Sequence, residues 1–172
     1  MRQLFYILIV LLFPICFSTH AQSNEAFKRL QFIDNFVSHG IPLSWDKSDA
    51  KIRALGRVIK VETEEYEAPH DKGLMLEKRI YHLDGLQVIA HFVKGDNSRC
   101  QLSKAIVTKP KWKIEKGLRV GSSIKSVVKY LGEPTSKSKG TYEYCGETSV
   151  DCAIFEFKNS KVMKITFTYY LD

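Results

Sequence analysis

One stretch decides the fold: Val120-Gly-Ser-Ser-Ile-Lys-Ser-Val-Val-Lys-Tyr-Leu-Gly-Glu-Pro134. Four of its apolar residues recur at the i, i+3, i+4 and i+7 spacing of one buried helical face. They are Ile124, Val127, Val128 and Leu131. The Gly-Ser-Ser at 121–123 supplies an N-cap, and Gly132 and Pro134 end the pattern. The sequence therefore predicts a short amphipathic helix that follows Ser123 and ends at Leu131.

Three strands are predicted after this helix, at 141–145, 152–158 and 161–170. Each combines β-branched or aromatic residues with the period of two that marks a half-buried strand. Asn159-Ser160 forms the turn between the last two. The stretch and its strands together predict a helix packed on an antiparallel sheet.

The cysteines predict one disulfide. Cys145 and Cys152 stand at the mouth of the hairpin between the first two of these strands, where two cysteines can face each other within bonding distance. We therefore predict a Cys145–Cys152 bridge, with Cys100 left over; pairing of Cys100 with either of the other two is the alternative. Because these three cysteines include no CxxC pair and no neighbouring histidine, we expect no metal site.

A faint echo of the pattern lies 76 residues upstream. The dipeptide Leu55-Gly56 recurs as Leu131-Gly132, and Tyr66-Glu67 recurs as Tyr142-Glu143. Both pairs are separated by the same 76 residues. A shared offset indicates one structural unit used twice.

The upstream half adds two predicted helices and four predicted strands. Near-helical spacing predicts helices over 24–39 and 46–55, and a change of period from about 3.6 to 2 predicts strands after them. The strands are expected at 57–67, 77–84, 86–94 and 101–108, with Asp84-Gly85 as a hairpin turn. The predicted fold class is α+β: two helix-plus-antiparallel-sheet units in tandem, over 22–108 and 109–172, with the helices packed on one face of the sheet.

The first 21 residues predict a secretory signal peptide. Arg2 precedes an uncharged apolar run from Leu4 to Phe17, and Ala21 ends a small-residue cleavage pattern. This run is too short for a comfortable transmembrane helix, although an uncleaved N-terminal anchor is the alternative. We expect a periplasmic or secreted protein with no stable membrane insertion after cleavage.

The charge of the chain is unevenly distributed. The formal net charge is +7, residues 103–139 carry ten Lys or Arg, and residues 61–71 are acidic without Lys or Arg. A basic face can steer association with an acidic partner. A solvated lysine-rich surface is the alternative interpretation.

The stretch 120–134, followed by a Tyr-bearing strand, an apolar hairpin strand and a final strand, resembles the beta-lactamase inhibitor protein-like fold. This fold is shared with small outer-membrane assembly lipoproteins of the BamE type (SmpA/OmlA). The upstream unit departs from the motif, because Arg57-Val58 follows Gly56 without a proline. The resemblance implies that the sheet face away from the helices is concave, bears aromatic residues and docks onto a protein partner. Tandem members are inhibitors, and others act in envelope assembly.

The candidate partner-binding residues are aromatics on that face and a basic frame around it. Tyr and Trp contribute binding energy because a large apolar body carries a polar tip. The predicted set is Tyr66, Tyr81, Trp112, Tyr142, Tyr144 and Tyr170, framed by Lys111, Lys113, Lys116 and Arg119. An error of one residue in strand parity would instead place part of this set in the core.

These features together predict an exported, non-enzymatic protein-binding module without a cofactor. We expect a periplasmic inhibitor or immunity-type protein that sterically blocks an enzyme or toxin. A cell-envelope assembly or maintenance factor is the alternative. A hydrolase that uses His82, His91 and Cys100 is a third possibility, although their spacing matches no motif with a known mechanism. Because the chain has an export signal, we expect no nucleic-acid partner.

Overall fold

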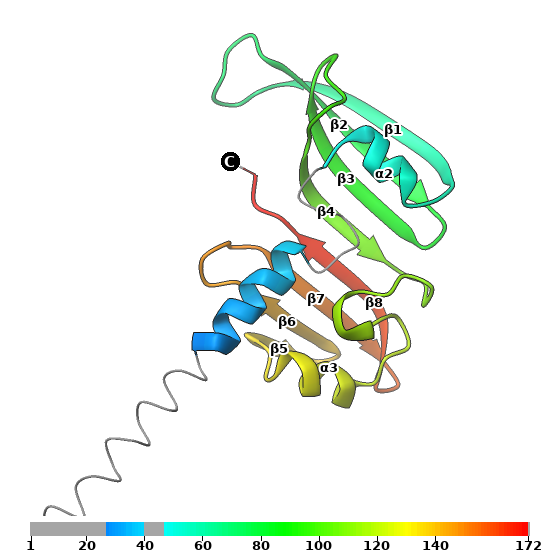
Figure 1. Ribbon diagram of the computed structural model, residues 1–172, viewed down its shortest axis with the longest axis vertical. Coiled ribbons are helices and arrows are strands. Elements are labelled where there is room, and N and C mark those ends of the chain that lie inside the picture. The colour runs from blue at the N-terminus through cyan, green and yellow to red at the C-terminus, as the bar shows by residue number, and fades with distance from the viewer. Residues whose placement is uncertain (1–26, 40–46, 172) are drawn as a thin grey trace, which may run out of the picture. The chain divides into compact units, whose positions relative to one another are not determined.

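The computed structural model describes residues 27–39 and 47–171 (Figure 1). The chain divides into two units, up to Phe32 and from Ile33 onward. In the first unit, residues 27–32 are helical; in the second, residues 33–39 are helical. The predicted signal peptide lies outside the described residues. The further elements, all in the second unit, are α2 (Asp49–Ala54), β1 (Val58–Glu67), β2 (Met75–Leu83), β3 (Leu86–Val93), β4 (Gln101–Val107), the 3₁₀ helix η1 (Glu115–Gly117), α3 (Ile124–Leu131), β5 (Ser136–Ser138), β6 (Thr141–Cys145), β7 (Cys152–Lys158) and β8 (Lys161–Thr168).

The strands form one continuous antiparallel sheet of eight strands in the order β1-β2-β3-β4-β8-β7-β6-β5. β4 pairs with β8 through residues 104–107 and 165–168, and Figure 1 shows these two strands side by side. The prediction of two tandem helix-plus-sheet units is therefore wrong. Strand pairing explains the difference: β4 and β8 satisfy each other's backbone groups, whereas two separate sheets would leave both strands as open edges.

Most predicted elements are confirmed to within a few residues. α3 begins after Ser123, whose hydroxyl accepts a hydrogen bond from the Ser126 N–H at 3.1 Å. It ends at Gly132, whose φ of +77° suits a residue without a side chain. β5 was not predicted, because its three residues are all exposed and carry no apolar pattern.

Only one of the two recurring dipeptides occupies equivalent positions in the two halves of the structure. Leu55 caps α2 and Leu131 is the last residue of α3, so both Leu-Gly pairs end a helix. The two tyrosines, however, are not equivalent. Tyr66 lies on the edge strand β1 and is half-buried, whereas Tyr142 lies on β6 and is buried. Taking them as repeat partners was wrong, because Tyr66 lies on the first strand after α2, whereas Tyr142 lies on the second strand after α3.

One face of the sheet, called here the core face, forms the hydrophobic core. The strand register places six of its buried residues in a single row across six strands. They are Tyr81, Val88, Ala105, Phe167, Ala153 and Tyr144, and none is more than 1% exposed. Burying such a row supplies the main driving force for folding.

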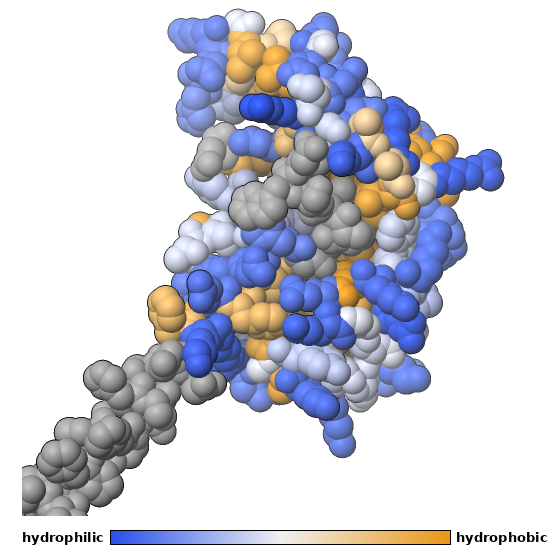
Figure 2. Space-filling model, viewed as in Figure 1, coloured by the Kyte–Doolittle hydropathy of each residue, from blue (hydrophilic) through white to orange (hydrophobic). Residues whose placement is uncertain are grey.

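The helices cover this same face. The Phe36 ring lies 6.4 Å from the ring of Phe155 and 5.8 Å from that of Phe167. The Asp49 carboxylate, at the start of α2, accepts a 2.5 Å hydrogen bond from the Tyr81 hydroxyl. The Tyr144 hydroxyl donates to the Gly132 carbonyl at the end of α3. Figure 2 shows this helix-bearing side, on which hydrophilic residues surround small apolar patches.

Candidate functional site

The face of the sheet opposite the core face, called here the open face, carries four isoleucines on four strands. They are Ile80, Ile89, Ile106 and Ile154, each half-buried. Each lies next in sequence to a core-face residue that is 0% exposed, so strand alternation turns it to the other side. Ile80 pairs with Ile89, while Ile106 and Ile154 flank Thr166. The contacts of the 33–39 helix, α2 and α3 described above are all with the core face.

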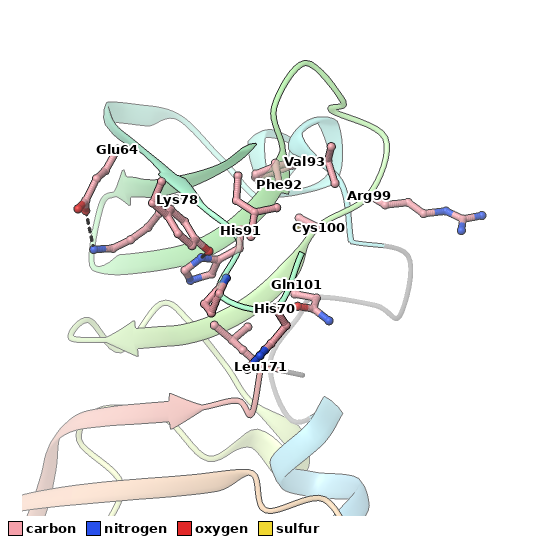
Figure 3. Close-up of a pocket in the computed structure, with 13 residues that line it drawn as sticks. Glu64, His70, Lys78, His91, Phe92, Val93, Arg99, Cys100, Gln101 and Leu171 are labelled. Carbon is pink, nitrogen blue, oxygen red and sulfur yellow. Dashed lines mark hydrogen bonds and ion pairs between the residues drawn. The ribbon is translucent and has the colours of Figure 1, made fainter. Parts of the chain in front are cut away.

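A cleft of about 830 Å³ lies at the β1–β3 end of the open face (Figure 3). Three of its residues come from neighbouring strands: Tyr66 on β1, Leu76 on β2 and His91 on β3. A loop after β1 adds Pro69 and His70, and Leu171 comes from the C-terminal tail. Volumes between about 300 and 1,000 Å³ are typical of small-ligand sites.

A chain of hydrogen bonds links three strands at this cleft. The Tyr66 hydroxyl lies 2.6 Å from His91 Nδ1, and His91 Nε2 lies 3.0 Å from Ser103 Oγ. Burial lowers the pKa of His91, and the nearby Lys78 ammonium lowers it further. Burial also raises the pKa of Tyr66. Both side chains are therefore neutral near pH 7 and present dipoles to the cleft.

Two further groups complete the cleft. The Lys78 ammonium donates to the Glu64 carboxylate at 2.9 Å (Figure 3). Cys100 is a free cysteine whose pKa burial raises to about 11. Because the thiolate is the nucleophilic form, this thiol is unreactive at neutral pH.

The three residues of the predicted hydrolase do not form a catalytic set. His82 pairs with Gln87 and His91 with Lys78, so the two histidines lie four residues apart along the hairpin. That separation is about 13 Å at the rise of a β-strand, well beyond hydrogen-bond reach. His82 lies 3.0 Å from a Glu62 oxygen. The nitrogens of His91 face Tyr66 and Ser103, not Cys100.

Three predicted binding aromatics lie in the core, which corrects the prediction for them. Tyr81, Tyr142 and Tyr144 are 0%, 9% and 1% exposed. All three side chains lie on the core face, because they alternate with open-face residues such as Ile80 and Glu143. A partner cannot contact side chains that are buried in the core.

The other predicted residues are exposed in part but do not form one surface. Tyr66 lies in the cleft, and Tyr170 is 65% exposed on the C-terminal tail. Trp112 donates to the Asp84 carbonyl and packs near Leu83 on the core-face side.

The basic frame is divided as well. The Lys111 ammonium is bound to the Asp84 carboxylate at 2.9 Å. Lys116 and Arg119 line a polar groove before α3, together with Ser122. Lys113 is exposed in the same loop. The predicted aromatic face with a basic frame is therefore not assembled as one site.

The isoleucines of the open face were missed, although the sequence carries their signal. Ile89, Ile106 and Ile154 each lie between two apolar core-face residues, as Ile89 does between Val88 and Ala90. The prediction considered only aromatic residues for the binding face, so it overlooked these aliphatic residues at the alternate strand positions.

The predicted disulfide is confirmed: Cys145 and Cys152 are directly paired across β6 and β7 and bonded to each other. Among the described residues, the group that could hold a metal by proximity is Glu143 with these two cysteines. The disulfide occupies both sulfur atoms, so they are not available as thiolate ligands.

Comparison with known proteins gives distant similarities. No family model matches the chain, and no curated protein matches it in sequence. The structure of the uncharacterized protein YfeY from Escherichia coli is similar at 13% identity and a TM-score of 0.38, covering 75% of this chain and 93% of YfeY. A candidate beta-lactamase inhibitor protein from Streptococcus mutans is similar at 18% identity and a TM-score of 0.27, covering 74% and 90% of the two chains.

These similarities establish neither a family nor a function for this chain. The resemblance to the inhibitor protein-like fold stays a prediction. The resemblance to lipoproteins of the BamE type stays a prediction. No helix among residues 27–39 and 47–171 is long and apolar enough to cross a membrane.

Proposed function

We propose that this chain is an exported, non-enzymatic protein-binding module that docks a folded protein on its open face. The observation that carries the proposal is the contrast between the two faces of one continuous sheet. The core face is covered by helices, and the open face presents Ile80, Ile89, Ile106 and Ile154 from four adjacent or near-adjacent strands. Apolar surface shared by several strands of a rigid sheet is suited to binding another protein.

The finer proposal is steric inhibition of an enzyme or toxin. A broad antiparallel face can cover an active-site entrance without entering it, and it needs no chemistry of its own. The positive net charge of the chain would steer an acidic partner toward it. The Cys145–Cys152 bridge supports export, because disulfides persist mainly in oxidising compartments.

Site-directed photocrosslinking in the source cell tests the docking face. A photoreactive residue at Ile89 or Ile106 should give a discrete adduct with one protein. The matched controls are Lys125 and Lys129, which are exposed positions on α3. Adducts at the α3 positions alone, or equal adducts at all four positions, would contradict the proposal.

A second experiment separates binding from folding. In the purified pair, Ile89→Lys combined with Ile106→Lys should weaken binding at least about 100-fold, because two charges would enter the centre of an apolar interface. Loss of the partner's catalytic or toxic activity on adding the wild-type protein, but not the variant, would support inhibition. A variant with unchanged affinity would overturn the assignment of the face.

A further inference from the structure

We propose that the cleft at the β1–β3 end of the open face is a second binding site, whose ligand is a single-chain anionic amphiphile such as a long-chain carboxylate. This site is separate from protein docking in its chemistry, because its ligand is small and enters a concave space. The proposal rests on three observations of the described residues: apolar walls, more hydrogen-bond donors than acceptors, and one carboxylate that already has a partner.

The walls are apolar and come from four separate segments. Leu76 and Val93 face the space from neighbouring strands, Pro69 comes from the loop after β1, and Leu171 comes from the tail. Val93 is 44% exposed, so it presents apolar surface to solvent rather than to the core. The tail is held in place by the Tyr169 N–H, which donates to the Ser103 carbonyl at 3.0 Å. An alkyl chain is the ligand body that such walls fit.

The polar groups at the cleft are mainly donors. The Lys78 ammonium has three N–H donors, and Glu64 accepts one of them. The Gln101 amide and the His70 ring supply further donors at the other side (Figure 3). The Arg99 side chain points away from the cleft in the same view, so it is not assigned a role.

Among the residues that the structure describes, Glu64 is the carboxylate that lines the cleft, and Lys78 is its partner. The Tyr66 hydroxyl and His91 Nδ1 satisfy each other at the floor. A ligand that brings an acceptor with a negative charge therefore meets unused donors at Lys78. A ligand that brings a cation meets the ammonium and finds its one possible counter-charge already occupied. Charge complementarity thus selects a carboxylate head beside Lys78, with its chain along Leu76 and Val93.

Calorimetric titration of the oxidised protein tests the inference with two probes of equal chain length. Dodecanoate and dodecyltrimethylammonium are each used below their micellar concentrations. We expect saturable binding of one dodecanoate per chain, at least tenfold tighter than binding of the cation. Equal affinity for the two probes, or no binding of dodecanoate, would overturn the proposal.

Matched variants locate the site. Val93→Glu should weaken dodecanoate binding at least tenfold, because it places a carboxylate in the wall beside the ligand. Val150→Glu makes the same change at a position that is 66% exposed and outside the cleft, and it should leave binding unchanged. Lys78→Gln removes the ammonium and frees the Glu64 carboxylate, so it should remove or reverse the preference for the anionic head group. Unchanged binding by Val93→Glu would refute the site.

The two proposals fail in different ways. If a photoreactive residue at Val93 gives the same protein adduct as Ile89 and dodecanoate does not bind, the cleft belongs to the protein interface and the ligand site is refuted. If dodecanoate binds as expected and Ile89 gives no adduct, the docking face fails and the ligand site stands.

Discussion

At the residue scale, Asp49 connects α2 to the sheet. Its carboxylate accepts hydrogen bonds from the Tyr81 hydroxyl at 2.5 Å, from Arg53 at 2.6 Å and from Arg79 at 3.3 Å. Burial alone would raise the pKa of Asp49, but the hydrogen bonds from Arg53 and Tyr81 and the two guanidinium charges hold it below its usual value. One carboxylate thus satisfies a buried phenol and fixes the first turn of a helix.

Asp49→Ala should destabilise the chain by about 1–3 kcal/mol, because it leaves the Tyr81 hydroxyl buried without its acceptor. The measurement is the urea midpoint of unfolding. Tyr81→Phe serves as the matched variant, since it removes the donor as well. The double variant should be more stable than the sum of the two single effects predicts, and strictly additive effects would show that the two groups are not coupled.

His91 makes a prediction about pH. Its pKa in the folded chain is lowered by burial and by Lys78, whereas in the unfolded chain it is about 6.5. On acidification the unfolded chain therefore binds the proton first. The stability that depends on neutral His91 is fully present above about pH 6.5 and is lost as the pH falls through the folded pKa.

The stability difference between the wild type and His91→Gln should therefore shrink as the pH falls from 7.5 to 5. Lys78→Gln should make the wild-type pH dependence shallower, because it removes one cause of the lowered pKa. Urea unfolding at several pH values measures both effects. A difference that stays constant or grows on acidification would contradict this account of His91.

At the element scale, the disulfide loop connects three parts of the chain. Asp151 accepts from the Ser38 hydroxyl at 2.8 Å and from the Tyr170 N–H at 2.9 Å. The Thr148 N–H donates to Asp34 at 3.1 Å. The loop between β6 and β7 thus holds both the helical residues 33–39 and the C-terminal tail against the sheet.

Replacing both Cys145 and Cys152 by serine should lower the free energy of unfolding by about 2 kcal/mol, the chain-entropy value for so short a loop. Cys100→Ser keeps the bridge and is the control. Hydrogen exchange should also accelerate in residues 33–39 of the double variant. Equal stability of the double variant and the wild type would show that the hairpin and its hydrogen bonds fix the loop without the bridge.

The sequence predicted the elements better than their faces. Asp84-Gly85 and Asn159-Ser160 mark hairpin turns, so the strands on both sides could be located. Tyr81 was placed on the wrong face. Alternation along a strand divides its residues between two faces, but it does not show which face the helices cover. The uniformly apolar parity of β3, which pairs with Tyr81 through Val88, identifies the core face once register is known. Pairing between distant strands cannot be read from local patterns.

At the scale of the whole molecule, the pairing of β4 with β8 decides how the chain behaves. These strands lie in the middle of the sheet, so hydrogen bonds cross from residues before 108 to residues after 160. Phe167 on β8 packs beside Phe36 and pairs with Ala105 on β4. The core is therefore shared across the junction, and neither half has a complete sheet by itself.

This continuous sheet predicts one cooperative unfolding transition. It also predicts that the stability of the whole chain depends strongly on the central strands. Ile106 pairs with Gln87 on one side and Thr166 on the other, so Ile106→Pro interrupts the ladder at its centre. We expect a loss of about 3 kcal/mol or more, the order of the effect of a proline that removes a backbone hydrogen bond. Ser138→Pro, on the edge strand β5, should have a much smaller effect.

Hydrogen exchange followed by mass spectrometry should show β2–β3 and β6–β7 losing protection together in Ile106→Pro. If β6–β7 kept native protection while β2–β3 exchanged freely, the two halves would fold independently. The β4–β8 pairing would then be a contact between two separately folded units.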